Sequence, residues 1–219
     1  MKYSKFIAEG LTEKVEVPED WVDVPFHKYP KFLRLCEEGK NGRPDTKEVF
    51  KLFFGLSQEM VDSDFDLKML HSMNEQLNFL SNDPNSTKVA THLKVDSVLY
   101  RVPSSVSEMK LGKYRDIVET GTEILTGRTE SVIDLLETYA EIIAIFIAKE
   151  GYTQTDLDDL KENVETLPTP EIISLGNFFM NQFESLRSGT SKNWFKAVKK
   201  TTATQKRALM KSVKILVTS

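Results

Sequence analysis

The best-spaced pair of metal-type side chains in this 219-residue sequence is His71 and Glu75. Residues four apart lie on one face of a helix, so the two side chains can meet there. Zinc, however, needs three or four protein ligands, and the other histidines, His27 and His92, belong to distant predicted elements. We therefore interpret these as ordinary surface or core histidines and expect no metal and no cofactor. The alternative, an enzyme acting through His71 and Glu75, requires a bound metal ion.

Three alternating acids, Asp62, Asp64 and Asp66, resemble the opening of a calcium-binding loop. Such a loop requires glycine at its sixth position and glutamate at its twelfth. The sequence has Leu67 and Met73 at those positions, so the match fails. We expect these acids to lie at the start of a helix, where carboxylates are favoured by the helix dipole.

The remaining reactive residue types do not form a recognisable catalytic group. Gly39-Lys40 and Gly112-Lys113 lack the preceding glycine and the following serine or threonine of a phosphate-binding loop. The single cysteine, Cys36, falls on the apolar face of a predicted helix, which favours a packed thiol over a nucleophile. Without a nucleophile, a base and an oxyanion site, we expect a non-enzymatic protein.

A basic segment at the C-terminus is the strongest candidate for binding. Residues 190–219 contain eight lysines or arginines and no acid, whereas the remainder has 21 basic and 33 acidic residues, a net charge of −12. Buried aromatic residues supply much of the energy of protein interfaces, so two aromatics in this segment are natural anchors. The predicted partner-binding residues are Trp194, Phe195, Lys196, Lys199, Lys200, Lys206, Arg207 and Lys211.

The basic segment has three interpretations. It can dock on an acidic partner protein, contact nucleic acid through phosphate neutralisation, or form a final amphipathic helix with a solvated lysine face. No base-reading motif accompanies the lysines, so sequence-specific DNA binding is disfavoured.

The stretch from Thr129 to Gly151 predicts the element around which the others pack. Its apolar stripe widens until every residue from Ile142 to Ala148 is apolar, and a helix that is apolar on all sides must be enclosed on all sides. A membrane span needs about 20 such residues, so we expect a buried core helix and no membrane partner. The predicted fold is mainly α: a single helical domain around a central helix at about 129–150.

Smaller elements complete the predicted domain over residues 1–189. Alternating residues from Lys14 predict a short N-terminal strand, and an aromatic helix is expected to begin near Pro30. Asp45 and Gly55 have the residue types of an N-cap and a left-handed C-cap. Residues 88–102 predict a β-hairpin with its turn near Asp96. Gly151 is expected to end the central helix and Pro168 to introduce the last helix, and residues 190–219 form a separate basic arm.

The order of several segments resembles that of a known group of proteins. These segments are Val15-Glu16-Val17-Pro18-Glu19-Asp20-Trp21, Phe53-Phe54-Gly55-Leu56-Ser57, Leu77-Asn78-Phe79-Leu80, Leu111-Gly112-Lys113-Tyr114-Arg115-Asp116, Ile142 to Ala148, Gly151-Tyr152, Leu167-Pro168 and Gly176-Asn177-Phe178-Phe179. Over residues 12–188 the chain resembles small, mostly helical tailed-bacteriophage proteins that are encoded with virion genes and described as tail-assembly or structural proteins. The basic segment from Thr190 is not part of this pattern.

The resemblance implies a protein that binds other phage structural proteins, namely neck, tail or baseplate subunits, in the host cytoplasm during assembly. It leaves open a homo-oligomer or ring, and it does not say whether the protein stays in the virion. Two alternatives remain: a transient tail-assembly chaperone that is absent from the finished virion, and a nucleic-acid-associated protein that uses the lysine-rich tail.

Overall fold

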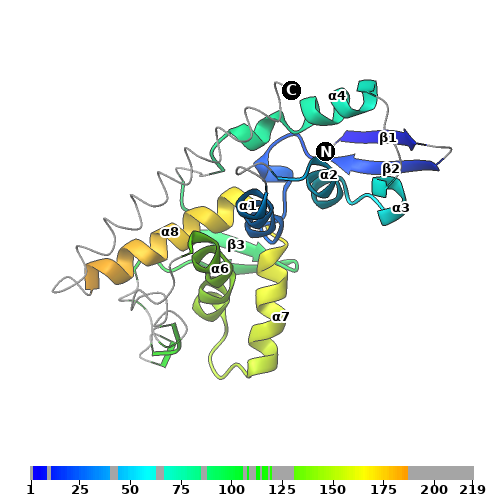
Figure 1. Cartoon of the computed structure of the whole chain (residues 1–219). Helices are drawn as coiled ribbons and strands as arrows, with labels where there is room; N and C mark the ends of the chain where they lie inside the picture. The colour runs from blue at the N-terminus through cyan, green and yellow to red at the C-terminus, as the bar shows by residue number, and fades with distance from the viewer. Residues whose placement is uncertain are drawn as a thin grey trace. The chain divides into compact units, whose positions relative to one another are not determined.

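The structure is a computed structural model that describes residues 2–8, 11–39, 44–62, 67–84, 88–105, 108, 112–113, 115–117, 119 and 131–186. It is mainly helical, as predicted, with short antiparallel strand pairs (Figure 1). The described residues belong to two compact units. Unit 1 contains those of 2–24 and 31–83, and unit 2 contains those of 25–30 and 84–186. The predicted boundary between residues 189 and 190 lies outside the described residues.

Unit 1 begins with an antiparallel hairpin of β1 (Lys2–Ala8) and β2 (Leu11–Val17), in which Lys2 faces Val17 and Ala8 faces Leu11. The predicted N-terminal strand corresponds to β2, which ends before Pro18 because proline cannot donate to a ladder. The sequence reasoning missed β1, whose apolar residues do not alternate regularly.

The core of unit 1 is built around Trp21, which lies in η1 (Trp21–Asp23) and is 2% exposed. Its ring centroid lies 6.2 Å from that of Phe32, 6.2 Å from that of Phe53 and 5.4 Å from that of Phe79. The indole Nε1–H donates to the backbone oxygen of Asn82 at 3.0 Å, which satisfies the one polar atom of the ring.

Short helices surround this aromatic cluster. They are α1 (Lys28–Glu38), α2 (Thr46–Phe54), α3 (Gln58–Asp62), α4 (Leu67–Gln76) and η3 (Asn78–Ser81). The predicted caps of α2 are confirmed, because Asp45 Oδ1 accepts from Lys47 N at 2.8 Å and Gly55 has φ 64°. The helix α1 begins two residues before Pro30, since proline is tolerated in the first turn; its residues 28–30 belong to unit 2.

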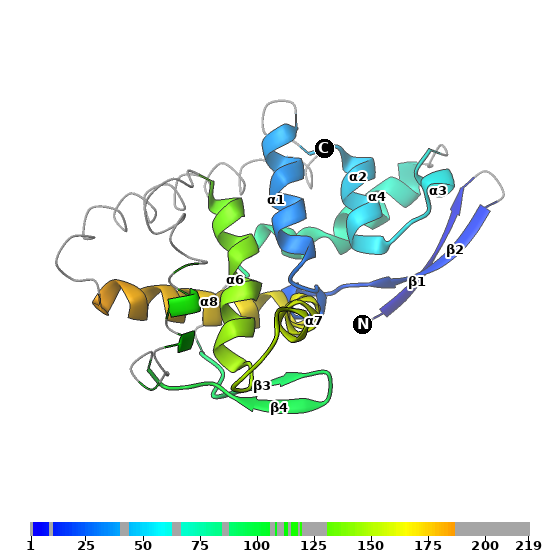
Figure 2. The ribbon, with the colours of Figure 1, turned by 90° about the horizontal axis from the view of Figure 1, so that it is seen from below.

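Unit 2 is organised around α6 (Val132–Ile147), as the apolar run predicted. Ser131 caps its start, and all residues from Ile142 to Ala148 are buried. Two further helices, α7 (Gln154–Glu165) and α8 (Thr169–Leu186), pack against it (Figure 2). The expectation that Gly151 ends α6 is wrong: Ala148 is the C-cap, and Gly151 supplies φ 74° to the turn that follows.

Within unit 2, α6 and α8 approach closely where the sequence has a glycine. The ring of Tyr139 lies directly against Gly176, and its hydroxyl donates to Asn177 Oδ1 at 3.0 Å. Both Tyr139 and Gly176 are buried, and burial raises the pKa of the Tyr139 phenol. The hydroxyl therefore stays protonated as a hydrogen-bond donor.

The predicted second hairpin is confirmed. It consists of β3 (His92–Val95) and β4 (Val98–Arg101), joined by Asp96 and Ser97 with φ of 45° and 63°. Two successive left-handed residues make the primed turn that matches the twist of antiparallel strands. The strands are shorter than the predicted span of 88–102.

Candidate interaction site at the second hairpin

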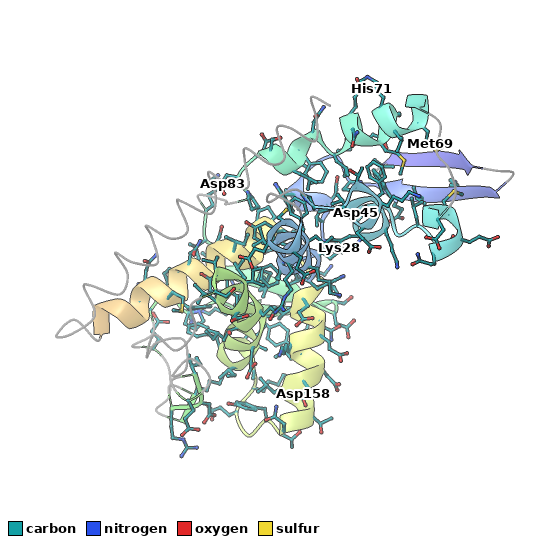
Figure 3. All side chains as sticks on the ribbon, in the orientation of Figure 1. Lys28, Asp45, Met69, His71, Asp83 and Asp158 are labelled. Atoms are coloured by element: carbon teal, nitrogen blue, oxygen red, sulfur yellow. The ribbon has the colours of Figure 1, made fainter. Side chains whose placement is uncertain are left out.

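The His71–Glu75 pair lies on the exposed surface of α4. His71 Nε2 and Glu75 Oε1 are 3.3 Å apart, but the side chains are 75% and 64% exposed (Figure 3). Across the ranges that the structure describes, no three histidine, cysteine or acidic side chains are grouped so as to hold a metal ion. The pair is a solvated i, i+4 contact on α4.

The Cys36 thiol is packed, as its place on the apolar helix face predicted. It is 4% exposed, and burial raises its pKa to about 12. A thiol with so high a pKa has almost no thiolate at neutral pH, and the thiolate is the nucleophilic form.

All eight predicted partner-binding residues lie outside the described residues, as do Asp64 and Asp66 of the acidic triplet. The binding role of Trp194, Phe195 and the accompanying lysines and arginine therefore stays a prediction. A candidate site formed by described residues lies elsewhere, at the second hairpin.

Such a site lies in unit 2, where a cleft of about 350 Å³ separates the second hairpin from α7 and the α6–α7 turn. Apolar groups from Val95, Ala148 and Leu160 form part of its wall, and Tyr100 and Tyr152 add hydroxyl groups. Its full lining is Val95, Asp96, Val98, Tyr100, Ala148, Lys149, Glu150, Gly151, Tyr152, Asp156, Asp159, Leu160 and Asn163.

The charged residues of this cleft are mainly acidic. Asp96, Glu150, Asp156 and Asp159 line it together with a single cation, Lys149. Asp156 also closes the capping box of α7, and the backbone hydrogen bond from Thr153 lowers the pKa of its carboxyl group. The cleft therefore favours positively charged over negatively charged groups.

Lys113 and Asp116 hold the turn that borders the cleft. The Lys113 ammonium donates to the backbone oxygens of Phe146, at 3.2 Å, and of Ala148, so it satisfies carbonyls at the end of α6. Burial lowers the pKa of Lys113, and Glu150 opposes that shift. The Tyr152 hydroxyl donates to Asp116 Oδ2 at 2.5 Å. Sequence reasoning did not predict these contacts, because they join residues more than thirty positions apart.

We expect the Tyr152 hydroxyl, which is bonded to Asp116, to lose its proton at a higher pH than an ordinary tyrosine. Partial burial, followed by the bond and the charge of Asp116, raises the pKa of Tyr152 from 10.0 to about 12. The folded state holds this proton longer than the unfolded state, so the contribution of protonated Tyr152 to stability is fully present below pH 10 and is lost as the pH rises from 10 to about 12. Ultraviolet difference titration of phenolate should therefore lose a step near pH 12 in Tyr152→Phe.

The control for this titration is Asp116→Asn, which removes the carboxylate charge and should move the Tyr152 step back towards pH 10. An unchanged step in Asp116→Asn would contradict the assigned cause.

The hairpin face turned away from the cleft is apolar and cationic. Residues that are directly opposite across an antiparallel pair share a face, so Lys94 and Leu99 lie together, with Arg101 two positions along β4. Leu99 is 66% exposed, and Lys94 and Arg101 are also exposed. On the opposite face of β3, the side chains of Leu93 and Val95 are buried, so packing of that face fixes the position of the exposed one.

Comparison of the chain with protein-family models, curated proteins and solved structures gave no match. Among the described residues, no helix combines the length and apolar character needed to cross a bilayer. The second hairpin thus has an exposed leucine and cations on one face, and an acidic cleft with Val98 on the other.

Proposed function

We propose that this protein is a non-enzymatic structural or tail-assembly protein of a tailed phage, and that it binds other virion subunits. The observation that supports this best is the second hairpin, where Leu99 is 66% and Val98 is 46% exposed. Val98 and Leu99 are adjacent in β4 and point to opposite faces, so the hairpin carries one exposed apolar side chain on each face that a partner chain can cover.

The resemblance to phage tail-assembly proteins supports the same proposal from the sequence. The basic segment at 190–219 provides a second binding element, which docks on an acidic neighbour. A subunit with two separate contact regions can join two neighbours, as assembly of a neck, tail or baseplate requires.

The test is quantitative mass spectrometry of purified particles of the encoding phage, produced with the natural protein or with Leu99→Ser. The natural protein should be present in a fixed ratio to the tail subunits, and Leu99→Ser should lower that ratio. Val22→Ser is the matched control, because Val22 is 59% exposed but lies in unit 1.

Absence of the natural protein from finished particles, together with recovery from assembly intermediates, would support the chaperone alternative. Absence from both would contradict the proposal.

The nucleic-acid alternative is favoured by one observation, the eight basic residues without an acid in residues 190–219. It predicts that the full chain is retained on DNA with a steep salt dependence, because each neutralised phosphate releases counterions. A chain ending at Ser188 should lose that retention. If the full chain is not retained even at low salt, the alternative is excluded.

A further inference from the structure

We infer that β4 accepts an extended, acidic segment of a partner protein as a third strand of the second hairpin. The partner is specified on the premise of the proposed function, that the chain binds other subunits. Three features of β4 support this inference: an unpaired backbone edge, an exposed leucine, and cations on the same face.

The backbone edge follows from the register of the hairpin. Val102 N donates to Thr91 O at 2.9 Å, so Thr91 and Val102 form a hydrogen-bonded pair. Such pairs alternate with non-bonded pairs along an antiparallel ladder. Leu99 and Arg101, which face Lys94 and His92, are therefore in non-bonded pairs, and their N–H and C=O groups point away from β3.

This edge is accessible in unit 2. Figure 2 shows β4 on the side of the hairpin that faces away from α6 and α7. Within the described part of the chain, the outward groups of Leu99 and Arg101 have no hydrogen-bond partner. An added strand can bond to all of these groups, as in other cases of β-strand addition.

The side chains specify what the added strand should contain. We expect the partner residue beside Leu99 to be apolar, because contact between the two side chains would bury the apolar surface of Leu99, which is 66% exposed. A partner residue two positions along would lie beside Arg101, which is opposite His92, and Lys94 lies on the same face of the hairpin, opposite Leu99. Neither cation has an ion-pair partner among the described residues, so an acidic side chain at that position is favoured.

A second copy of this chain fits the edge less well. Pairing β4 with β4 would bring Lys94 and Arg101 of both copies onto one face, where like charges repel. Short edge strands with charges are also a common protection against self-association. Protection against self-association does not explain why Leu99, in the middle of β4, is exposed. An acidic partner strand would cover that side chain.

The inference can be tested on the isolated full chain with the peptide Thr-Glu-Thr-Val-Thr-Glu-Thr, which places Val and Glu on one face of a strand. We expect fluorescence polarisation to detect binding that weakens with salt, and amide hydrogen exchange to slow at Leu99 and Arg101. Two control peptides are matched in length: one has Lys in place of Glu, and one carries N-methyl groups on the backbone nitrogens of Val and of the threonine on either side of it, which removes the donors that would face β4 in an antiparallel or a parallel addition. Both should bind at least about tenfold more weakly.

Variants then assign the binding to β4. Arg101→Glu should weaken the acidic peptide by about tenfold and strengthen the lysine peptide, and Leu99→Ser should weaken both. Val22→Ser should leave both affinities unchanged. These substitutions are at exposed positions, and circular dichroism of each variant checks that the fold is kept.

Three outcomes would overturn the inference. They are equal binding of the N-methylated peptide, insensitivity to Arg101→Glu, and a dimer of the peptide-free chain that Leu99→Ser dissociates; the last would assign the edge to a second copy. Peptide binding and incorporation into particles are separate measurements, so failure of one is distinguishable from failure of the other.

Discussion

Replacing Gly176 by alanine is expected to destabilise unit 2 by about 3 kcal/mol, the upper end of the usual cost of overpacking a core. A Cβ at this position would overlap Cγ, Cδ2 and Cε2 of the Tyr139 ring, and that ring is 3% exposed and cannot move into solvent. Alanine would gain up to about 1 kcal/mol in helix propensity, which does not offset the overlap. Urea unfolding followed by circular dichroism measures the change.

The matched control is Gly112→Ala, because Gly112 is also helical but has open space where a Cβ would be placed. This substitution should be neutral or stabilise the protein by up to about 1 kcal/mol. The double variant Tyr139→Ala/Gly176→Ala should be more stable than the sum of its single effects predicts, since the ring that clashes is gone. Equal effects of Gly176→Ala and Gly112→Ala would contradict the close approach of α6 and α8.

Replacing Trp21 by alanine is expected to lower the free energy of unfolding of unit 1 by about 3–5 kcal/mol, the range for truncating a large buried aromatic. The indole contacts Phe32, Phe53 and Phe79, and its removal leaves a cavity at the centre of their cluster. Because a few kcal/mol is a large part of the stability of a small unit, we expect unit 1 to be partly unfolded in this variant.

Amide hydrogen exchange measured for each segment tests this prediction. We expect faster exchange in α2 and η3. The neighbouring Val22, which is 59% exposed, provides the control: Val22→Ala should change stability by less than about 0.5 kcal/mol. If Trp21→Ala leaves exchange in α2 and η3 unchanged, Trp21 is not central to the core of unit 1.

Local patterns in the sequence predicted the elements whose signals are local. The all-apolar run from Ile142 to Ala148 predicted a buried helix, and Asp45 and Gly55 predicted the ends of α2, because caps depend on a few adjacent residues. The hairpin around Asp96 was predicted from its alternation, although its turn has serine at the position where glycine is most common.

The candidate site could not be predicted in the same way, because it is formed by distant parts of the chain. Nothing near Lys113 indicates that its ammonium will bond to carbonyls of Phe146 and Ala148. The alternation of apolar and polar residues predicted the second hairpin, but it did not show which face of the hairpin would be buried. That depends on Leu93 and Val95 packing inward, which leaves Leu99 exposed.

Residues 25–30 belong to unit 2, although the chain on both sides of them belongs to unit 1. Phe26 N donates to Leu167 O at 2.8 Å and His27 N donates to Glu165 O at 3.0 Å, so this short stretch binds the end of α7. During synthesis it leaves the ribosome well before residues 165–167. Unit 2 therefore cannot be completed until residues 165–167 have been synthesised, and a fragment starting at Pro84 would lack a piece of its own structure.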